Sequence, residues 1–340
     1  MRAFAVIPWL LLVLASVAAA VPAQAPGVPV YEDSEGDEPS REEKALQQAA
    51  LVLKEAGKLL DGKVVKEQLA RTKCALVLPP AATKPLTGPE AWRRARSAYV
   101  RVGHLYQCKH CSDWHLNLAG GYAIAADGIV ATCHHVVLPD DRDMKEAWLV
   151  CADDDGHVFP VHEVLAADAR TDVAILRTGA RKAEPLPLRV DVVPGETCWV
   201  FSDPMGARGV FSSGIVHRFV QAPPLDGGGE RVVVVEVGAD WAPGSSGSAV
   251  LDACGNTIGH VASIKAQLEE PEEAGEPAAA GDVAPPMPLA TYLVQHAATR
   301  AADVLRLIEV VPAKPVEPAK PVEAAKPVAP AKREPANAPR

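Results

Sequence analysis

Short apolar runs, many of them β-branched, recur between residues 98 and 264 and limit the fold more than any other feature of the sequence. Turn residues separate these runs. The strands expected from them span residues 98–105, 121–124, 129–137, 173–176, 197–201, 232–237 and 257–264. Many short strands at this spacing are typical of sandwiches and barrels. The sequence therefore predicts an all-β domain, which we place at residues 90–308.

The first 20 residues have the layout of a secretory signal peptide. Met1 and Arg2 precede an apolar stretch, and small residues end it at Ala20, where we expect cleavage. An uncleaved membrane anchor is the alternative, but Pro8 interrupts the stretch and its length is marginal for a span. We find no second stretch of this kind. The expected location is therefore periplasmic or extracellular, with no membrane span once the signal is removed.

Two segments separate the signal from the β-rich domain. Residues 21–39 are acidic and proline-rich, as expected for a solvated linker. Residues 40–89 are expected to form a helical segment and a linker. Ser40 and Glu43 have the spacing of a capping box, and apolar residues recur at helical spacing over residues 41–60.

The C-terminal end of the chain divides in a similar way. We expect a closing helix over residues 289–307 as the last element of the β-rich domain. Residues 309–340 repeat a Pro-Ala-Lys-Pro-Val theme, a composition that favours an extended, disordered tail. We expect no PDZ-like domain after the β-rich domain.

The charge of the chain argues against a nucleic-acid partner. Its 34 Lys and Arg residues are outnumbered by 43 Asp and Glu, which gives a net charge of -9 and a pI near 5.6. The basic residues do not cluster in one patch. The chain therefore lacks the positive electrostatic field that would attract the phosphates of a nucleic acid. Nothing in the sequence specifies an oligomeric state.

The segment Pro243-Gly244-Ser245-Ser246-Gly247 could carry nucleophilic chemistry. A serine hydroxyl attacks a carbonyl efficiently only when a base takes its proton and donors stabilise the oxyanion that forms. Gly244 allows a tight turn in which its N–H and that of Ser246 converge on one oxygen. Glycine and serine also make ordinary loops, so the segment alone leaves a structural role open.

Two further segments supply the groups that such a serine needs. The apolar run over residues 128–137 contains His134 and His135, and imidazole titrates close to neutral pH. Asp172 immediately precedes a second strongly apolar run. An aspartate there could equally cap a loop or pair with a surface cation.

Taken together, the three segments resemble the chymotrypsin-fold serine peptidases, and in particular the bacterial Deg-type (high-temperature-requirement) proteases without a PDZ domain. The chain order His, Asp, Ser is that of the family. The resemblance assigns the general base to His135, which directly precedes Val-Val, and the orienting acid to Asp172 in the pattern Asp-x-x-x-Asp-hydrophobic-Ala. The nucleophile is Ser246 in Gly-x-Ser-Gly. Further family landmarks match residues 194–196, 202–206 and 213–216.

The resemblance implies two antiparallel six-stranded β-barrels with the site between them. It makes residues 90–308 a trypsin-like peptidase domain that hydrolyses protein or peptide substrates through an acyl-enzyme, with no cofactor required for catalysis. Gly244 and Ser246 would form the oxyanion hole. The substrate would lie extended along a strand that contains His260, Val261, Ala262 and Ser263.

Specificity and activity each leave an alternative open. Asp240 stands six positions before Ser246, the offset at which trypsin carries the acid that selects Lys or Arg, but the residues that follow it look more like the bacterial relatives. A surface aspartate is the alternative. Cys133-His134 and Ser248-Ala249 depart from the family pattern beside the base and the nucleophile. A catalytically inactive binding protein with the peptidase fold is therefore the second hypothesis.

The seven cysteines cannot all pair within the chain, so at least one is free, bridged elsewhere or metal-bound. The spacing His104-x3-Cys108-x2-Cys111-x3-His115 offers two thiolates and two imidazoles, a set that could hold a structural zinc ion. A disulfide or unrelated thiols are the alternatives, because export favours oxidation. A metal or redox module on the peptidase fold is the third hypothesis.

Overall fold

The computed structural model describes residues 28–33, 39–224, 226–268 and 291–312. The expected signal peptide, most of the acidic linker and nearly all of the C-terminal tail lie outside the described residues. No helix in the described part of the chain is long and apolar enough to cross a membrane.

Six strands close into an N-terminal barrel, in the order β6-β3-β4-β5-β8-β7, because β6 pairs with both β3 and β7. A short strand, β1 (Leu60–Asp61), adds to the outside of β6. The strands of the barrel are β3 (Tyr99–Cys108), β4 (Trp114–Ala125), β5 (Ile129–Thr132), β6 (Met144–Ala152), β7 (Val158–Asp168) and β8 (Val173–Thr178). Its interior is filled by fully buried aliphatic side chains, among them Val102, Val130, Leu149 and Leu176. Alternating apolar residues on neighbouring strands thus meet inside the barrel.

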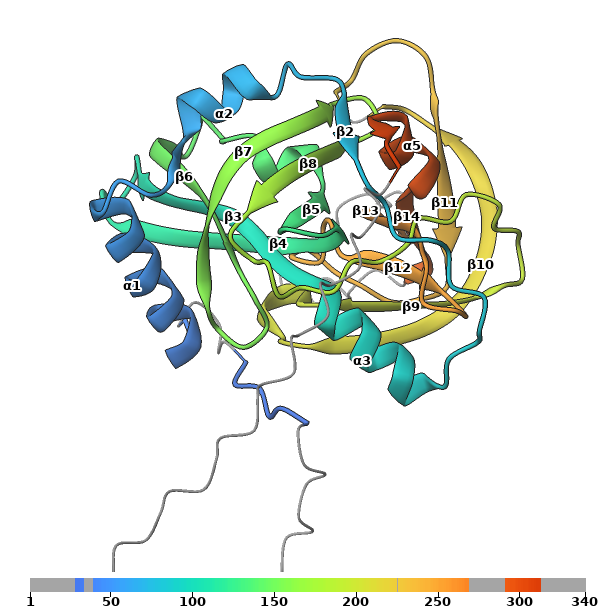
Figure 1. Ribbon diagram of the computed structural model, residues 1–340. Coiled ribbons are helices and arrows are strands. Elements are labelled where there is room, and N and C mark those ends of the chain that lie inside the picture. The colour runs from blue at the N-terminus through green and yellow to red at the C-terminus, as the bar shows by residue number, and fades with distance from the viewer. Residues whose placement is uncertain (1–27, 34–38, 225, 269–290, 313–340) are drawn as a thin grey trace, which may run out of the picture.

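A second closed barrel, in the order β10-β11-β14-β13-β12-β9, follows in the sequence. Its strands are β9 (Thr197–Ser202), β10 (Val210–Ala222), β11 (Val232–Val237), β12 (Ala249–Asp252), β13 (Thr257–Leu268) and β14 (Thr291–Arg300). Val200, Val235, Val250 and Ala298 pack in its interior. The two antiparallel six-stranded barrels confirm the predicted all-β fold, and Figure 1 shows them side by side.

Short helices surround the barrels, with α1 and α2 on the outer side of the N-terminal barrel and α5 beside β13 and β14 (Figure 1). They are α1 (Arg41–Glu55), α2 (Gly62–Gln68), α3 (Gly88–Ala98), α4 (His134–Val137) and α5 (Ala301–Arg306), with a 3-10 turn, η1, at Pro204–Gly206. The capping box predicted at the start of α1 is present, with Ser40 and Glu43 bonding each other's backbone amides. The helix ends before residue 60, however, because Gly57 adopts a positive φ of 65°.

Two sequence expectations are wrong in detail. The run over residues 129–137 is not one strand: β5 ends at Thr132 and α4 begins at His134. The expected closing helix over residues 289–307 is instead strand β14 followed by the short helix α5. The physical reason is that β14 bonds to both β11 and β13, so its backbone completes the second barrel.

A shared apolar core joins the two barrels. Tyr99 of β3 and Phe201 of β9 meet edge to face, with ring centroids 5.1 Å apart. Two strands outside the barrels also contribute to this interface. Strand β2 (Cys74–Leu76), which precedes the barrels in the sequence, pairs in parallel with β15 (Ile308–Val310), which follows them. Side chains that the two barrels contribute to their interface are therefore held at fixed positions relative to one another.

Candidate active site

His135 and Asp172 form a hydrogen-bonded pair. His135 lies in α4, just after β5, and its Nδ1 is 2.8 Å from Oδ2 of Asp172. The backbone N–H of His135 donates to the other carboxylate oxygen at 2.9 Å. Because Nδ1 is occupied by the carboxylate, Nε2 is the ring nitrogen left to exchange a proton with another group. The imidazole is 47% exposed, whereas the carboxylate is 2% exposed.

Asp172 is held in a strained, buried turn between β7 and β8. Its φ of 59° lies in the left-handed region, which an aspartate adopts more readily than most residues. Burial alone would raise the pKa of this carboxyl, but the hydrogen bonds from the ring and amide of His135 outweigh it, and the pKa lies below its ordinary value. The neighbouring Thr171 carbonyl accepts a bond of 2.8 Å from the Thr299 hydroxyl on β14. The second barrel therefore anchors the turn that carries the acid.

Two side chains that the sequence did not assign to the acid lie directly beneath it. The His260 ring is fully buried, with Nε2 3.0 Å from the backbone carbonyl of Asp172 and Nδ1 3.4 Å from the Tyr122 hydroxyl. The Cys133 thiol is also fully buried and donates to the Val261 carbonyl at 3.1 Å. The structure thus brings His260 to the acid rather than to the surface along which the substrate was expected.

Ser246 lies in a tight turn between β11 and β12. Gly244 and Gly247 on either side of it have φ values of 98° and 82°, which residues with a Cβ rarely adopt. The Pro243 carbonyl accepts a bond of 2.7 Å from the Met205 amide. In a trans peptide the N–H of Gly244 then points the opposite way. Among the described residues the amides of Gly244 and Ser246 have no acceptor, which leaves both donors free for an oxyanion.

Contacts with the first barrel fix this turn in place. The Ser246 carbonyl accepts a bond of 2.7 Å from the Gly120 amide on β4. A Cβ at Gly247 would lie 2.3 Å from both the Gly120 carbonyl and Oγ1 of Thr132, so only glycine fits there. Within the described residues, however, no hydrogen bond joins the Ser246 hydroxyl to His135, whose ring nitrogen Nδ1 bonds to Asp172.

The remaining residues expected to bind substrate differ in their accessibility. Both backbone groups of Val261 are engaged, since its amide donates to Ser248 and its carbonyl accepts from Gly247. Strand β12 pairs with β13 only as far as His260. Ala262 is half-buried and Ser263 is exposed, and both follow the point where β12 stops.

The side chain of Asp240 lies on the surface. Asp240 is exposed, and its backbone carbonyl accepts a bond of 2.7 Å from the Ser212 hydroxyl. No described cation pairs with its carboxylate. This position matches the alternative of a surface aspartate as well as it matches a selective pocket residue.

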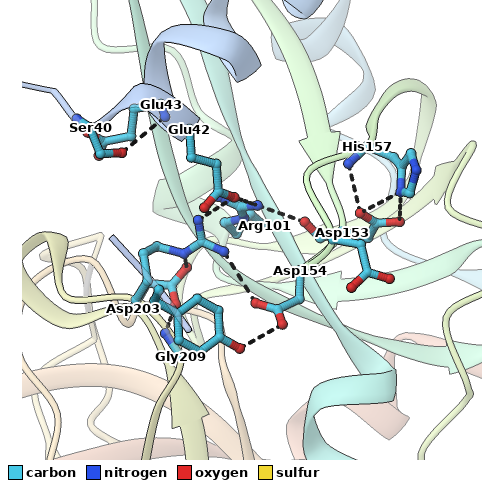
Figure 2. Close-up of polar contacts among 12 residues, drawn as sticks. Ser40, Glu42, Glu43, Arg101, Asp153, Asp154, His157, Asp203 and Gly209 are labelled. Atoms are coloured by element: carbon cyan, nitrogen blue, oxygen red, sulfur yellow. Dashed lines mark hydrogen bonds and ion pairs between the residues drawn. The ribbon is translucent and has the colours of Figure 1, made fainter. Parts of the chain in front are cut away.

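A buried cluster of charged side chains, which the sequence analysis did not predict, holds the loop over residues 203–209. This loop forms the hydrogen bond from the Met205 amide to the turn that carries Ser246. Arg208 pairs with Asp203 of the same loop at 3.0 Å, with Asp154 at 3.2 Å and with Glu42 of α1 at 2.5 Å. Figure 2 shows Glu42, Asp154 and Asp203 converging from different elements, and Arg101 beside them donates to Glu42 at 3.0 Å and to the Asp153 carbonyl at 2.7 Å. Burial raises the pKa of Asp203, although the Arg208 charge opposes this. No sequence motif could reveal this cluster, because its partners are distant along the chain.

The cysteine and histidine set divides into two parts. The structure brings Cys108, Cys111 and His115 together, with one donor atom from each within 4.8 Å of the others. His104 lies apart from this group and is buried in the barrel. All seven cysteines lie in the described residues, and none is disulfide-bonded there.

Comparisons with known proteins agree with this architecture. Residues 119–259 match the family model for a trypsin-like peptidase domain. A probable periplasmic DegP-like serine endoprotease of Halomonas elongata is 29% identical over 152 residues, which cover 44% of this chain and 30% of that protein. The chloroplastic Protease Do-like 5 of Arabidopsis thaliana is 26% identical over 140 residues, which cover 39% of this chain and 43% of that protein. The chain therefore spans less than half the length of each of these relatives.

Solved structures are also similar to this chain. The Rv3671c protease from M. tuberculosis in its active form matches with a TM-score of 0.47 and 18% sequence identity, covering 69% of this chain and 90% of that one. A serine endoprotease from Yersinia pestis matches with a TM-score of 0.43 and 18% identity, covering 66% of each chain.

Proposed function

We propose that this chain is a serine endopeptidase, because residues 119–259 match a trypsin-like peptidase domain and the similar proteins include Deg-type proteases. Ser246 is the nucleophile, His135 the general base and Asp172 the orienting acid. The observation that carries the proposal is the 2.8 Å bond between Nδ1 of His135 and the buried carboxylate of Asp172, which leaves Nε2 to act as the base.

The mechanism uses groups from both barrels. As Oγ of Ser246 attacks the scissile carbonyl carbon, Nε2 of His135 takes the hydroxyl proton, and Asp172 stabilises the imidazolium that forms. The free amides of Gly244 and Ser246 bind the oxyanion. The imidazolium then gives its proton to the leaving amine, and water hydrolyses the acyl-enzyme by the same route. The bond between Ser246 and His135 need only form when substrate is bound, since catalytic hydrogen bonds often tighten in the complex.

The substrate of this proposal is an extended protein or peptide segment. It would pair with the free side of β13 from Ala262 onward, where β12 no longer covers that strand. Whether Asp240 selects Lys or Arg side chains is tested by comparing the cleavage of a peptide library by wild type and by Asp240→Ser. If Asp240 selects them, the variant should lose the preference for Lys or Arg. The reaction needs no cofactor, and the proposed site of action is the periplasm or the extracellular space.

Covalent labelling of the full chain with a fluorophosphonate tests the proposal. Wild type is expected to react with one label per chain, and Ser246→Ala to lose the label completely, because only an activated hydroxyl reacts at an appreciable rate. Ser245→Ala is the matched control and should keep the label, since the Ser245 hydroxyl is buried against Ser202 at 3.0 Å. Peptide hydrolysis should fall roughly 10⁶-fold in Ser246→Ala.

The competing hypothesis predicts a different result. A folded wild-type chain that takes no label and hydrolyses no member of a peptide library, yet binds peptides, would be a catalytically inactive member of the fold. Circular dichroism of the unlabelled protein would establish that it is folded. That outcome would overturn the peptidase assignment.

A further inference from the structure

We propose that the end of the β3–β4 hairpin binds a zinc ion through Sγ of Cys108, Sγ of Cys111 and Nε2 of His115, a group called here the hairpin cluster. This site does not depend on the proposed peptidase activity. None of its three residues takes part in the mechanism above.

The distances within the hairpin cluster suit zinc. The three donor atoms lie within 4.8 Å of one another, and Sγ of Cys111 is 3.0 Å from Nε2 of His115. Zinc binds thiolate sulfur at about 2.3 Å and imidazole nitrogen at about 2.0–2.1 Å in tetrahedral geometry, so its donor atoms stand roughly 3.5–4 Å apart. Only small side-chain movements are needed to reach that spacing.

The local backbone already holds the two sulfurs on one side of the turn. The amide of His110 donates to Sγ of Cys108 at 3.3 Å, and the amide of Cys108 donates to the Asp113 carbonyl at 2.9 Å. Ser112, directly after the second cysteine, has a positive φ of 63°. The chain therefore reverses sharply after Cys111, and β4 brings His115 back toward the thiols.

Packing fixes the imidazole from the other side. His115 faces Tyr106 across the β3–β4 ladder, and the two rings stack with centroids 5.5 Å apart and planes 26° apart. A stacked ring has few alternative orientations, so Nε2 stays directed at the thiols. A preorganised ligand loses little conformational freedom when a metal binds.

The fourth coordination position is left to water in this proposal. His104, the fourth ligand expected from the sequence, is 3% exposed and lies inside the barrel, whereas Cys111 is exposed. The nearby His110 and Asp143 side chains already bond each other at 3.1 Å. Three protein ligands at an accessible turn give an open site.

The hairpin cluster is also tied to the segment that follows the catalytic histidine. The Lys109 amide donates to the Asp143 carbonyl at 2.9 Å, and Cys108 lies opposite Met144 in the β3–β6 ladder. Residues 138–143 connect α4, which carries His135, to this point. A bound zinc ion would therefore stabilise the end of the loop that leaves α4.

Metal analysis of the full chain, purified under reducing conditions without a metal-affinity step, tests the proposal. We expect about one zinc ion per chain by inductively coupled plasma mass spectrometry. After zinc removal, cobalt(II) should produce sulfur-to-metal charge-transfer absorption. Loss of a supporting group alone typically lowers metal affinity 10–100-fold, so Cys111→Ser and His115→Ala should each weaken cobalt binding more than about 100-fold.

Matched controls separate this site from adventitious binding. Cys254→Ser removes a partly exposed thiol in the second barrel, and His157→Gln removes an exposed imidazole, so both variants should bind cobalt as wild type does. Substoichiometric zinc in wild type, or equal cobalt affinity in wild type and Cys111→Ser, would overturn the proposal. So would a Cys108–Cys111 disulfide that persists in the reduced preparation by mass spectrometry. Fluorophosphonate labelling of Ser246 should be unchanged in Cys111→Ser, which separates this test from that of the peptidase function.

Discussion

The N-terminal barrel contains two groups of potential metal ligands, each with a histidine and at least one cysteine, and burial distinguishes them. In both groups a histidine lies with two potential metal ligands, and the donor atoms of each group fall within 4.8 Å. In the first, Cys133 and Asp172 are buried beside His135. In the hairpin cluster the second thiol is exposed and the other two donors are half-buried.

This difference shows why proximity of donor atoms does not by itself make a metal site. Asp172 already accepts two bonds from His135, and a protonated Nδ1 has no lone pair to give a metal. Burial, and then the nearby Asp172 charge, raises the pKa of the Cys133 thiol well above its ordinary value, so its thiolate is costly to form. The buried group is thus suited to orienting a proton acceptor, and the exposed group to binding a cation.

The largest effect that would test the comparison is expected from Asp172→Asn. An asparagine keeps the shape of the side chain but favours the wrong imidazole tautomer and does not stabilise the imidazolium, which costs about 10⁴-fold in kcat for a site of this kind. Peptide hydrolysis should fall by that factor, while zinc content stays at about one per chain. In contrast, Cys111→Ser should lose the zinc and keep kcat within about threefold. A loss of zinc in Asp172→Asn would mean that the two groups are not independent.

A second test uses His104, whose side chain lies in the barrel interior and not in the hairpin cluster. Burial lowers the pKa of His104 to about 4. Between pH 6.5 and 4 the unfolded chain therefore binds a proton that the native chain does not, and stability falls as the pH falls. Over that window the loss reaches about 3 kcal/mol, at about 1.4 kcal/mol for each pH unit. Below pH 4 both states are protonated and the loss stops growing.

Denaturant unfolding of wild type and His104→Gln between pH 7 and pH 3.5 measures this loss. The variant should be less sensitive to acid by about 3 kcal/mol, because glutamine does not titrate. His157→Gln, which removes an exposed imidazole, serves as control and should follow wild type. Removal of zinc should leave the difference between wild type and His104→Gln unchanged. A difference that vanished with the metal would place His104 among the ligands.

The all-β fold could be predicted because local patterns carry its information. Strand β11 matches the predicted range of residues 232–237, and β3, β8 and β9 lie within a few residues of theirs. Strand β10 was not predicted, because most of its residues are exposed or half-buried and show no clear alternation of polar and apolar residues. Strand β14 was mistaken for a helix, since only pairing with β11 and β13, which are distant in the sequence, makes it a strand.

At the site, the sequence motifs predicted which residues come together but not how deeply each side chain is buried. The segments around His135 and Asp172 gave the acid and its partner, and the structure joins them. The same reasoning placed His260 beside the substrate, whereas its ring is buried under the acid. Nothing in a linear sequence tells which face of β13 turns inward at that residue, because a bulge between Val261 and Ser263 shifts the alternation.

The smallest expected effects come from replacing one cysteine in each group by alanine. Because the substitution is the same, any difference in its effect reflects the surroundings of the thiol. Cys133→Ala removes a buried thiol that donates to the Val261 carbonyl, and we expect a loss of about 1 kcal/mol in unfolding free energy, with zinc content unchanged. Cys111→Ala removes an exposed thiol, so in zinc-free protein it should change stability by less than about 0.5 kcal/mol. With zinc present, Cys111→Ala should instead lower the Tm relative to wild type, because a metal that binds only the native state stabilises it. Thermal unfolding of both variants with and without a chelator measures these four values, and equal responses to the chelator would remove the distinction between the two groups.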